Sequence, residues 1–346
     1  MENEIYNVPN IIYSGKIDCN GSPVEAVVLN SRSIYSGSRD GIIRIWDLRN
    51  HNLIKEIKAH EDWVTALFLK RSLLFSAGKD GIIKIWNAKT GELIRELKGH
   101  TSGILDLDVR KELLASGSTD ATARLWKYKT GECVRVIDGH HRIVSGVKLT
   151  KKRLVTASWD HFVKIWDLKT GNCLDSYEAH YDAINTIEAK GAIIISGDQS
   201  RIIQIYDGKK KALINTLHGH TRMLTDVLID RDFLFSCAQD GCIIQWDLDS
   251  GTMLKRLEGH TDAILCMDKH KNFLLSGSAD GTIRIWDDRS VHSIETLQEH
   301  DDIVLQISSD GNYIVSAGTE NQILVWDLDE GECIKKIDTG FSTWIW

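Results

Sequence analysis

The sequence predicts an all-β protein, an eight-bladed β-propeller built from four-stranded antiparallel blades. The first observation is an aromatic ladder with a step of 40 residues, formed by Trp46, Trp86, Trp126, Trp166, Tyr206, Trp246, Trp286 and Trp326. The second is that serine or threonine, histidine and acidic residues recur with the same step. A repeat of about 20–50 residues is the signature of solenoids and propellers. Since eight such units fill nearly all of the 346 residues, we expect one domain over residues 1–346.

Each unit has the pattern of short strands. Residues 81–100, GIIKIWNAKTGELIRELKGH, hold two β-rich runs joined by a turn at which Gly91 can supply a positive φ. Asp-Gly pairs at 40–41, 80–81, 240–241 and 280–281 mark a second tight turn. Four strands with such turns use the whole unit and leave no room for an ordinary helix. Stacking these small sheets around an axis buries both faces of each sheet and predicts the propeller.

The two ends of the chain leave open how the ring closes. Residues 11–18, IIYSGKID, align with outer-strand segments such as LIKEIKAH and CIKKIDTG, which gives nine such segments for eight blades. Either the N-terminal strand at about 11–18 completes the last blade, or a C-terminal strand at 333–338 does. The remaining tail of residues 333–346 carries Phe341, Trp344 and Trp346. We expect these aromatics to pack on a blade face, with a partner anchor as the alternative.

Composition indicates a soluble globular protein. Apolar residues make up 42% and charged residues 26%, and the net charge of −7 does not favour nucleic acid or an anionic membrane as the main partner. The start of the chain, MENEIYNVPN, lacks the pattern of a signal peptide, and no apolar run is long enough to span a membrane. Seven cysteines without a C-x-x-C pair favour reduced thiols. We expect a cytoplasmic protein, with the nucleus as the alternative.

The Gly-His, Ser, Asp-Gly and Trp-Asp signals, repeated in register, resemble the WD40 repeat over roughly residues 11–338. The segments ASGSTDATARLW at 115–126 and TGECVRVIDGH at 130–140 are similar to the compact repeats of F-box substrate receptors of ubiquitin ligases, but no F-box segment precedes the repeats. The resemblance implies a propeller that holds proteins or peptides on its rim.

Histidine, serine and aspartate in each unit invite a catalytic interpretation, but an active site has no reason to recur at 40-residue steps. We interpret the sets as structural tetrads, in which the carboxylate accepts bonds from the histidine and the hydroxyl, and the hydroxyl bonds the indole. The tetrads are His60, Ser76, Asp80 and Trp86; His100, Ser116, Asp120 and Trp126; His140, Thr156, Asp160 and Trp166; His220, Ser236, Asp240 and Trp246; and His260, Ser276, Asp280 and Trp286.

Three units depart from the pattern. Asn20 replaces the histidine of the first unit, and Glu320 replaces the aspartate of the eighth. In the fifth unit, SGDQSRIIQIYD, Ser200 and Tyr206 stand where aspartate and tryptophan are expected, so both ends of its network are predicted to be lost. This loss is either tolerated drift or an exchange for function, with Arg201 at a position where four other units have glycine.

In the WD40 family, the turn ending at the acid and the loop after the histidine lie on one rim. The repeat register places seven residues of units four to six on this rim: Arg142, Trp159, His161, Gln199, Arg201, Arg222 and Met223. Acids elsewhere on it are Glu61, Asp62, Asp182, Asp262, Asp301 and Asp302. The basic arc suits an acidic or phosphorylated peptide, because guanidinium groups bind such anions in a bidentate way. The alternative for this arc is ordinary solvated surface charge. A second candidate contact is Trp63 with Lys79 and Arg39, and its alternative is an aromatic residue that only covers its neighbours.

The channel-facing positions are predicted to be Glu25, Thr65, Leu105, Ser145, Asn185, Thr225, Leu265 and Leu305. They hold one acid, no paired carboxylates and no set of metal ligands, so we expect no metal and no cofactor. Two classes of function remain. The first is a non-catalytic interaction scaffold in a multiprotein assembly, with acidic or phosphorylated peptide recognition as a narrower form. The second is a propeller enzyme, which would need inward-facing acids or histidines from several units.

Overall fold

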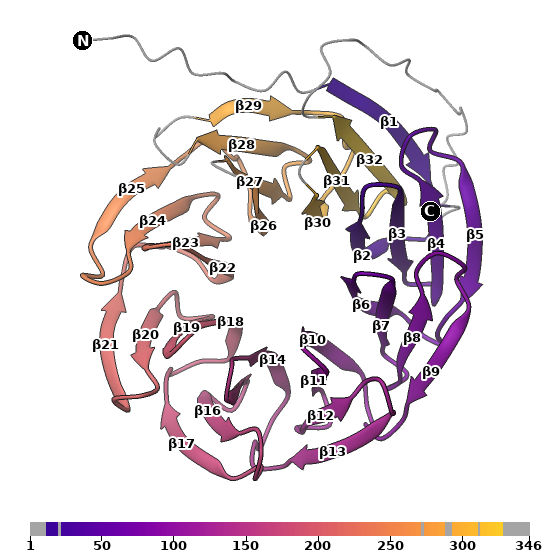
Figure 1. Cartoon of the computed structure of the whole chain (residues 1–346). Helices are drawn as coiled ribbons and strands as arrows, with labels where there is room; N and C mark the ends of the chain where they lie inside the picture. The colour runs from indigo at the N-terminus through magenta and orange to yellow at the C-terminus, as the bar shows by residue number, and fades with distance from the viewer. Residues whose placement is uncertain (1–11, 20–21, 271–272, 288–292, 311, 328–346) are drawn as a thin grey trace, which may run out of the picture.

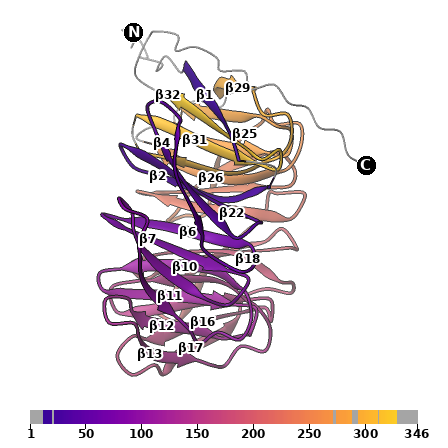
Figure 2. The ribbon, with the colours of Figure 1, turned by 90° about the vertical axis from the view of Figure 1, so that its right-hand side faces the viewer.

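The computed structural model describes residues 12–19, 22–270, 273–287, 293–310 and 312–327. Within them, the strands form eight separate four-stranded antiparallel sheets, arranged as blades around a central axis (Figure 1). Figure 2 shows the same ring from the side. The predicted all-β propeller with eight blades is confirmed. We number the blades 1 to 8 in chain order.

Each blade runs outward from the axis in four strands. The innermost strands are β2 (Val24–Leu29), β6 (Val64–Lys70), β10 (Ile104–Arg110), β14 (Val144–Leu149), β18 (Ile184–Lys190), β22 (Leu224–Asp230), β26 (Ile264–His270) and β30 (Val304–Ser309). The second strands are β3 (Ser33–Ser38), β7 (Leu73–Gly78), β11 (Leu113–Ser118), β15 (Arg153–Ser158), β19 (Ile193–Asp198), β23 (Phe233–Ala238), β27 (Phe273–Ser278) and β31 (Tyr313–Gly318).

The two outer strands of each blade begin after the tight turn. The third strands are β4 (Ile42–Asp47), β8 (Ile83–Asn87), β12 (Ala123–Lys127), β16 (Phe162–Asp167), β20 (Ile203–Asp207), β24 (Ile243–Asp247), β28 (Ile283–Asp287) and β32 (Gln322–Asp327). The outermost strands are β5 (Leu53–Lys58), β9 (Leu93–Leu97), β13 (Glu132–Ile137), β17 (Cys173–Glu178), β21 (Ala212–Leu217), β25 (Met253–Leu257) and β29 (Ser293–Leu297), with β1 (Ile12–Asp18) in blade 8.

The ring is closed by the N-terminal strand. β1 pairs antiparallel with β32, with Tyr13 opposite Trp326 and Ile17 opposite Ile323. The sequence left two alternatives open, and in the structure the N-terminal strand completes the last blade. The second candidate strand at 333–338 and the aromatic tail lie outside the described residues.

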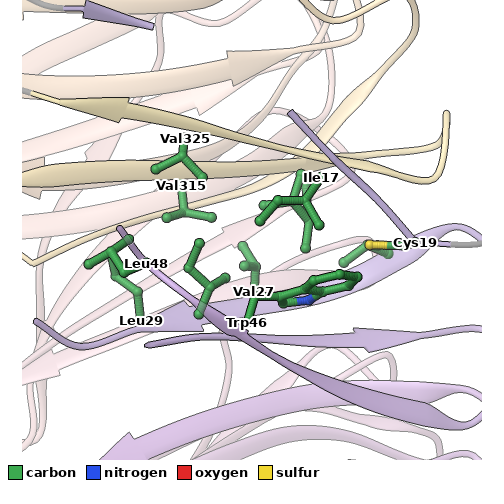
Figure 3. Close-up of a cluster of buried hydrophobic side chains, with 12 residues drawn as sticks. Ile17, Cys19, Val27, Leu29, Trp46, Leu48, Val315 and Val325 are labelled. Carbon is green, nitrogen blue, oxygen red and sulfur yellow. The ribbon is translucent and has the colours of Figure 1, made fainter. Parts of the chain in front are cut away.

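The hydrophobic core lies between neighbouring blades. In the cluster at the closure (Figure 3), Ile17 of β1 and Val325 of β32 meet Val27 of β2 and Trp46 of β4, all buried. The same arrangement recurs around the ring, where each tightly packed cluster draws residues from two adjacent sheets. Burial of apolar surface between blades therefore stabilises the ring as a whole, because no blade buries its own two faces.

Every innermost strand carries a β-bulge at its start. In blade 3 the register shifts between Ile104 and Asp106, so that Leu105 is the extra residue. The same shift occurs at the equivalent place in the other seven blades. A bulge resets the alternation of side chains along a strand, which changes which residues reach the channel.

Candidate interaction rim and the networks that support it

The five predicted tetrads are all assembled, and blade 3 shows their geometry. The Trp126 indole N–H donates to Ser116 Oγ at 3.0 Å. Ser116 Oγ lies 2.8 Å from His100 Nε2, and His100 Nδ1 lies 2.8 Å from Asp120 Oδ2. Because the ionised carboxylate can only accept, Nδ1 carries the proton and Nε2 accepts from the serine hydroxyl. The order is tryptophan, serine, histidine, aspartate, so the expected direct bond from hydroxyl to carboxylate was wrong.

The carboxylate at the end of each tetrad also holds the backbone of the rim. Asp120 accepts the backbone N–H of Thr101, in the loop after His100, and of Thr122, in the tight turn. Burial raises the pKa of Asp120, but hydrogen bonds from Thr122 and His100 outweigh it and lower that pKa to about 2. Burial lowers the pKa of His100. The tetrad therefore fixes the two rim segments of a blade, and we call the surface formed by these loops and turns the tetrad rim.

Blades 1 and 8 satisfy the network with other residues. In blade 1, where Asn20 lies outside the described residues, the buried Arg44 donates to Asp40 Oδ2 at 2.9 Å and to Glu56 Oε1 at 2.7 Å. In blade 8, Glu320 takes the place of aspartate and bonds His300 Nδ1. In both blades a charged side chain therefore still bonds the residue at the rim end of the network, Arg44 to Asp40 in blade 1 and Glu320 to His300 in blade 8.

Blade 5 rebuilds the acidic end of its network instead of losing it. Asp198, two residues before the expected position, is fully buried, and its Oδ2 lies 3.1 Å from His180 Nδ1. This is an ion-pair distance, although the two atoms are not aligned for a hydrogen bond as they are in the tetrads. The Ser200 hydroxyl donates to this carboxylate. Burial raises the pKa of Asp198, but His180 and Ser200 outweigh it and lower the pKa. The prediction that this end was lost is wrong, because sequence register alone did not show that a carboxylate two residues earlier reaches the histidine.

At the other end of that network the indole is indeed replaced. Tyr206 makes its hydrogen bond outward, to Asp175 in the outermost strand of blade 4. Ser196 keeps its contact with His180 Nε2 at 2.7 Å. Blade 5 therefore has a shorter internal network and an added tie to its neighbour.

The channel wall holds more acids than the sequence predicted. A polar cavity of about 260 Å³ is lined by the expected Leu105, Ser145, Asn185 and Thr225. It is also lined by Asp106, Lys148, Glu188 and Asp226, which the bulge turns toward the channel. The expectation that Glu25 was the one acid there is wrong, because strict alternation through the bulge put these residues on the other face.

These acids connect the blades. Asp106 Oδ2 accepts the backbone N–H of Val147 at 2.8 Å, and Asp226 Oδ2 accepts that of Met267 at 3.3 Å, each in the following blade. Lys148 Nζ lies 3.3 Å from Glu188 Oε2. Burial raises the pKa of Asp226 to about 6. Asp106 and Asp226 thus each bond the backbone of the following blade, and the Lys148 ammonium pairs with Glu188 of the blade after its own.

The part of the chain that the structure describes contains no group of three or more His, Cys, Asp or Glu side chains placed to hold a metal ion. No helix in the same residues is long and apolar enough to cross a membrane. The six cysteines among these residues are free thiols.

The second candidate contact is assembled on the tetrad rim. The Arg39 guanidinium carbon lies 4.2 Å from the centroid of the Trp63 ring, and Lys79 Nζ lies 3.1 Å from it. These are cation–π distances. The register of the repeats, with the rim geometry that the WD40 resemblance implies, predicted that these three residues adjoin.

The basic arc of blades 4 to 6 is assembled only in part. Arg201 has a left-handed φ of 76°, and its guanidinium donates to the Thr221 carbonyl, next to Arg222. Arg142 and Arg222 are exposed, but no described contact joins Arg142 to the other two arginines. His161 has a φ of 77° at the equivalent turn of blade 4, and Met223 is half-buried.

Two exposed aromatics lie on the same part of the rim. Trp159 is 38% exposed, and Tyr181, in the loop after His180, is 87% exposed. Tyr181 was missed from the sequence, although it directly follows a repeat histidine and its position could have marked it. The rim of blades 4 and 5 thus presents aromatic area beside exposed arginines.

Comparisons with known proteins agree with this architecture. The family model described as "WD domain, G-beta repeat" matches residues 13–47, 51–87, 91–127, 131–167, 211–247, 251–287 and 291–327. The unmatched repeat lies between residues 167 and 211 and holds β17 of blade 4 with β18, β19 and β20 of blade 5, whose departures are described above. The crystal structure of the computationally designed Ika8 protein has a TM-score of 0.87 and 30% identity, covering 91% of this chain and 99% of that one.

A curated human relative, "Kinesin-like protein KIF21A", is 42% identical over 45 residues. The match covers 13% of this chain and 3% of that protein. WD40 propellers generally bind other proteins and are generally non-catalytic. With seven family matches over most of its length and eight blades in the ring, the chain belongs to the WD40 repeat family.

Proposed function

We propose that this chain is a non-catalytic scaffold that holds partner proteins or peptides on its tetrad rim, within a multiprotein assembly in the cytoplasm or nucleus. The observation that carries this proposal is the exposure of Trp159 and Tyr181 on neighbouring blades. Aromatic residues and arginine are enriched where proteins bind each other, because they bring large contact areas at a low entropic cost. The tetrads support this role, because they hold the rim loops in place before a partner arrives.

The experiment compares partner capture from native cell extract by the wild-type chain and a Trp159→Ala/Tyr181→Ala variant. We expect the variant to lose partners at least tenfold while keeping its melting temperature. The matched control is Leu213→Ala/Ile214→Ala, which removes exposed apolar side chains from the outermost strand of blade 5. Equal capture by the wild type and the rim variant would contradict the proposal.

A narrower candidate is recognition of acidic or phosphorylated peptides, as in the substrate receptors of ubiquitin ligases. It is favoured by Arg201, whose guanidinium lies against the loop that carries Arg222. The test is an Arg142→Glu/Arg201→Glu/Arg222→Glu variant, with capture repeated after phosphatase treatment. Loss in both arms supports a phosphorylated ligand, loss in the variant alone supports an acidic one, and retention in both removes this candidate.

A further inference from the structure

Two cations from adjacent blades converge on the indole of Trp63. Arg39 follows β3 of blade 1, and Lys79 follows β7 of blade 2, and these blades are neighbours in the ring (Figure 1). The backbone fixes both positions, because Lys79 N–H donates to the Trp63 carbonyl at 2.9 Å and Arg39 N–H donates to the Pro23 carbonyl at 3.0 Å. The fold therefore places the three residues beside one another.

The positive charges of Arg39 and Lys79 are not neutralised to the same extent. Arg39 Nε is paired with the carboxylate of Glu25. The nearby Asp62 uses Oδ1 to accept the Trp63 backbone N–H at 2.7 Å. Lys79 is exposed, and no carboxylate of the described residues lies within 4.0 Å of its ammonium group. The ring is thus the main partner of the Lys79 charge.

The backbone of Lys79 packs closely on the next blade, while its side chain stays exposed. The neighbouring blade has the buried Gly103 where blade 2 has Trp63 and blade 4 has Ile143. A Cβ on Gly103 would lie only 3.3 Å from the Lys79 Cα, so a larger residue there would need a shift of the backbone that carries Lys79. A cation held on an aromatic ring has lost part of its side-chain freedom, so that binding an anion costs less entropy.

We propose that Lys79 and Arg39, held by Trp63, bind an anionic side chain of the partner, either a carboxylate or a phosphoryl group. This inference rests on the proposed function, because it assigns the chemistry of one contact on the same rim. A positioned ammonium and guanidinium suit both anions, since charge-assisted hydrogen bonds to them are short and strong. Arg39 contributes through its terminal nitrogens, because Nε is engaged by Glu25.

The experiment uses the full chain with ¹⁵N-labelled tryptophan and follows the indole N–H resonance of Trp63, assigned with a Trp63→Phe variant. The probes are disodium glutarate for the carboxylate and inorganic phosphate for the phosphoryl group, each at constant ionic strength. We expect a saturable shift of the Trp63 resonance with at least one probe, and the probe that saturates identifies the source of the anion.

Matched variants make the result decisive. Lys79→Gln should weaken the saturable shift at least fivefold, Lys79→Arg should keep it, and Lys151→Gln, an exposed lysine in the turn between β14 and β15, should leave it unchanged. No saturation with either probe, or equal saturation in Lys79→Gln, would overturn the inference. Failure of the scaffold proposal appears separately, as unchanged capture by the Trp159→Ala/Tyr181→Ala variant.

Discussion

The phenolic hydroxyl of Tyr206 donates a 2.6 Å hydrogen bond to the Asp175 carboxylate of the preceding blade. Its ring stacks on Tyr177, with centroids 3.8 Å apart and planes at 11°. Every other blade uses an indole at this position to bond its own serine or threonine. In blade 5 the aromatic residue instead ties two blades together, so the departure has a structural role.

Tyr206→Phe should destabilise the protein by about 1.5–3 kcal/mol, the range for a hydrogen bond to a charged group. The stacked ring remains, so the loss reports on the hydroxyl and the carboxylate left without its donor. Urea unfolding measures it. The control is Tyr181→Phe, which removes an exposed hydroxyl and should change stability by less than about 0.5 kcal/mol. Equal stability of Tyr206→Phe and the wild type would show that the bond contributes nothing.

Serine-to-alanine changes should cost different amounts in blades 3 and 5. Ser116 accepts from the Trp126 indole and contacts His100, whereas Ser196 contacts His180 and receives no bond from Tyr206. We expect Ser116→Ala to cost about 1 kcal/mol more than Ser196→Ala, because it leaves one more buried group without a partner. Melting curves of the two variants provide the measurement, and equal costs would contradict the assignment.

The buried Asp198 should be essential to blade 5. Asp198→Ala leaves His180 without its charged partner in a fully buried place, and removing one partner of a buried pair costs about 3–5 kcal/mol. The matched control is Ser158→Ala at the equivalent position of blade 4, which loses the bond donated to the Arg142 carbonyl and the bond accepted from the Asp160 N–H. Both are bonds between neutral groups, so chemical unfolding should show the control within about 2 kcal/mol of the wild type. A cost for Asp198→Ala no larger than that of the control would contradict the rebuilt network.

The tetrad acids should make stability fall at acid pH. The pKa of Asp120 is about 2 in the folded chain, below its unfolded value, so its contribution is complete above about pH 4 and is lost as pH falls through 2. This contribution is about 2 kcal/mol. Asp120→Asn should therefore lower the free energy of unfolding at pH 7 and matter much less at pH 2. A difference from the wild type that is independent of pH would contradict this linkage.

The 40-residue period predicted the fold and the members of the tetrads, and together with the rim geometry implied by the WD40 resemblance it also predicted that Arg39, Trp63 and Lys79 adjoin. Two features could be seen only in the structure. Asp198 replaces an acid from a different register, and the bulge before Asp106 changes which side of the strand faces the channel. Both depend on local backbone geometry, which one sequence does not reveal. The closure of the ring could also be decided only from the structure, because two segments of the chain match the outermost strand of the last blade.

Arg201 carries backbone strain that glycine would relieve. Its φ of 76° matches that of the glycines at the equivalent turns, such as Gly41 at 76° and Gly241 at 73°. A left-handed conformation costs an ordinary residue about 1–2 kcal/mol, and glycine returns about 0.5–1 kcal/mol of that through its greater unfolded entropy. Arg201→Gly should therefore stabilise the protein by about 0.5–1 kcal/mol.

Arg222→Gly is the matched control, because Arg222 is exposed and does not have a positive φ, so glycine should bring no gain there. Thermal unfolding of both variants measures the difference. If Arg201→Gly is more stable and also captures less partner, the strain is maintained for a contact on the rim. If it is more stable and captures as much, Arg201 is drift at a turn that tolerates it. A loss of stability in Arg201→Gly would mean that the bond to the Thr221 carbonyl outweighs the strain.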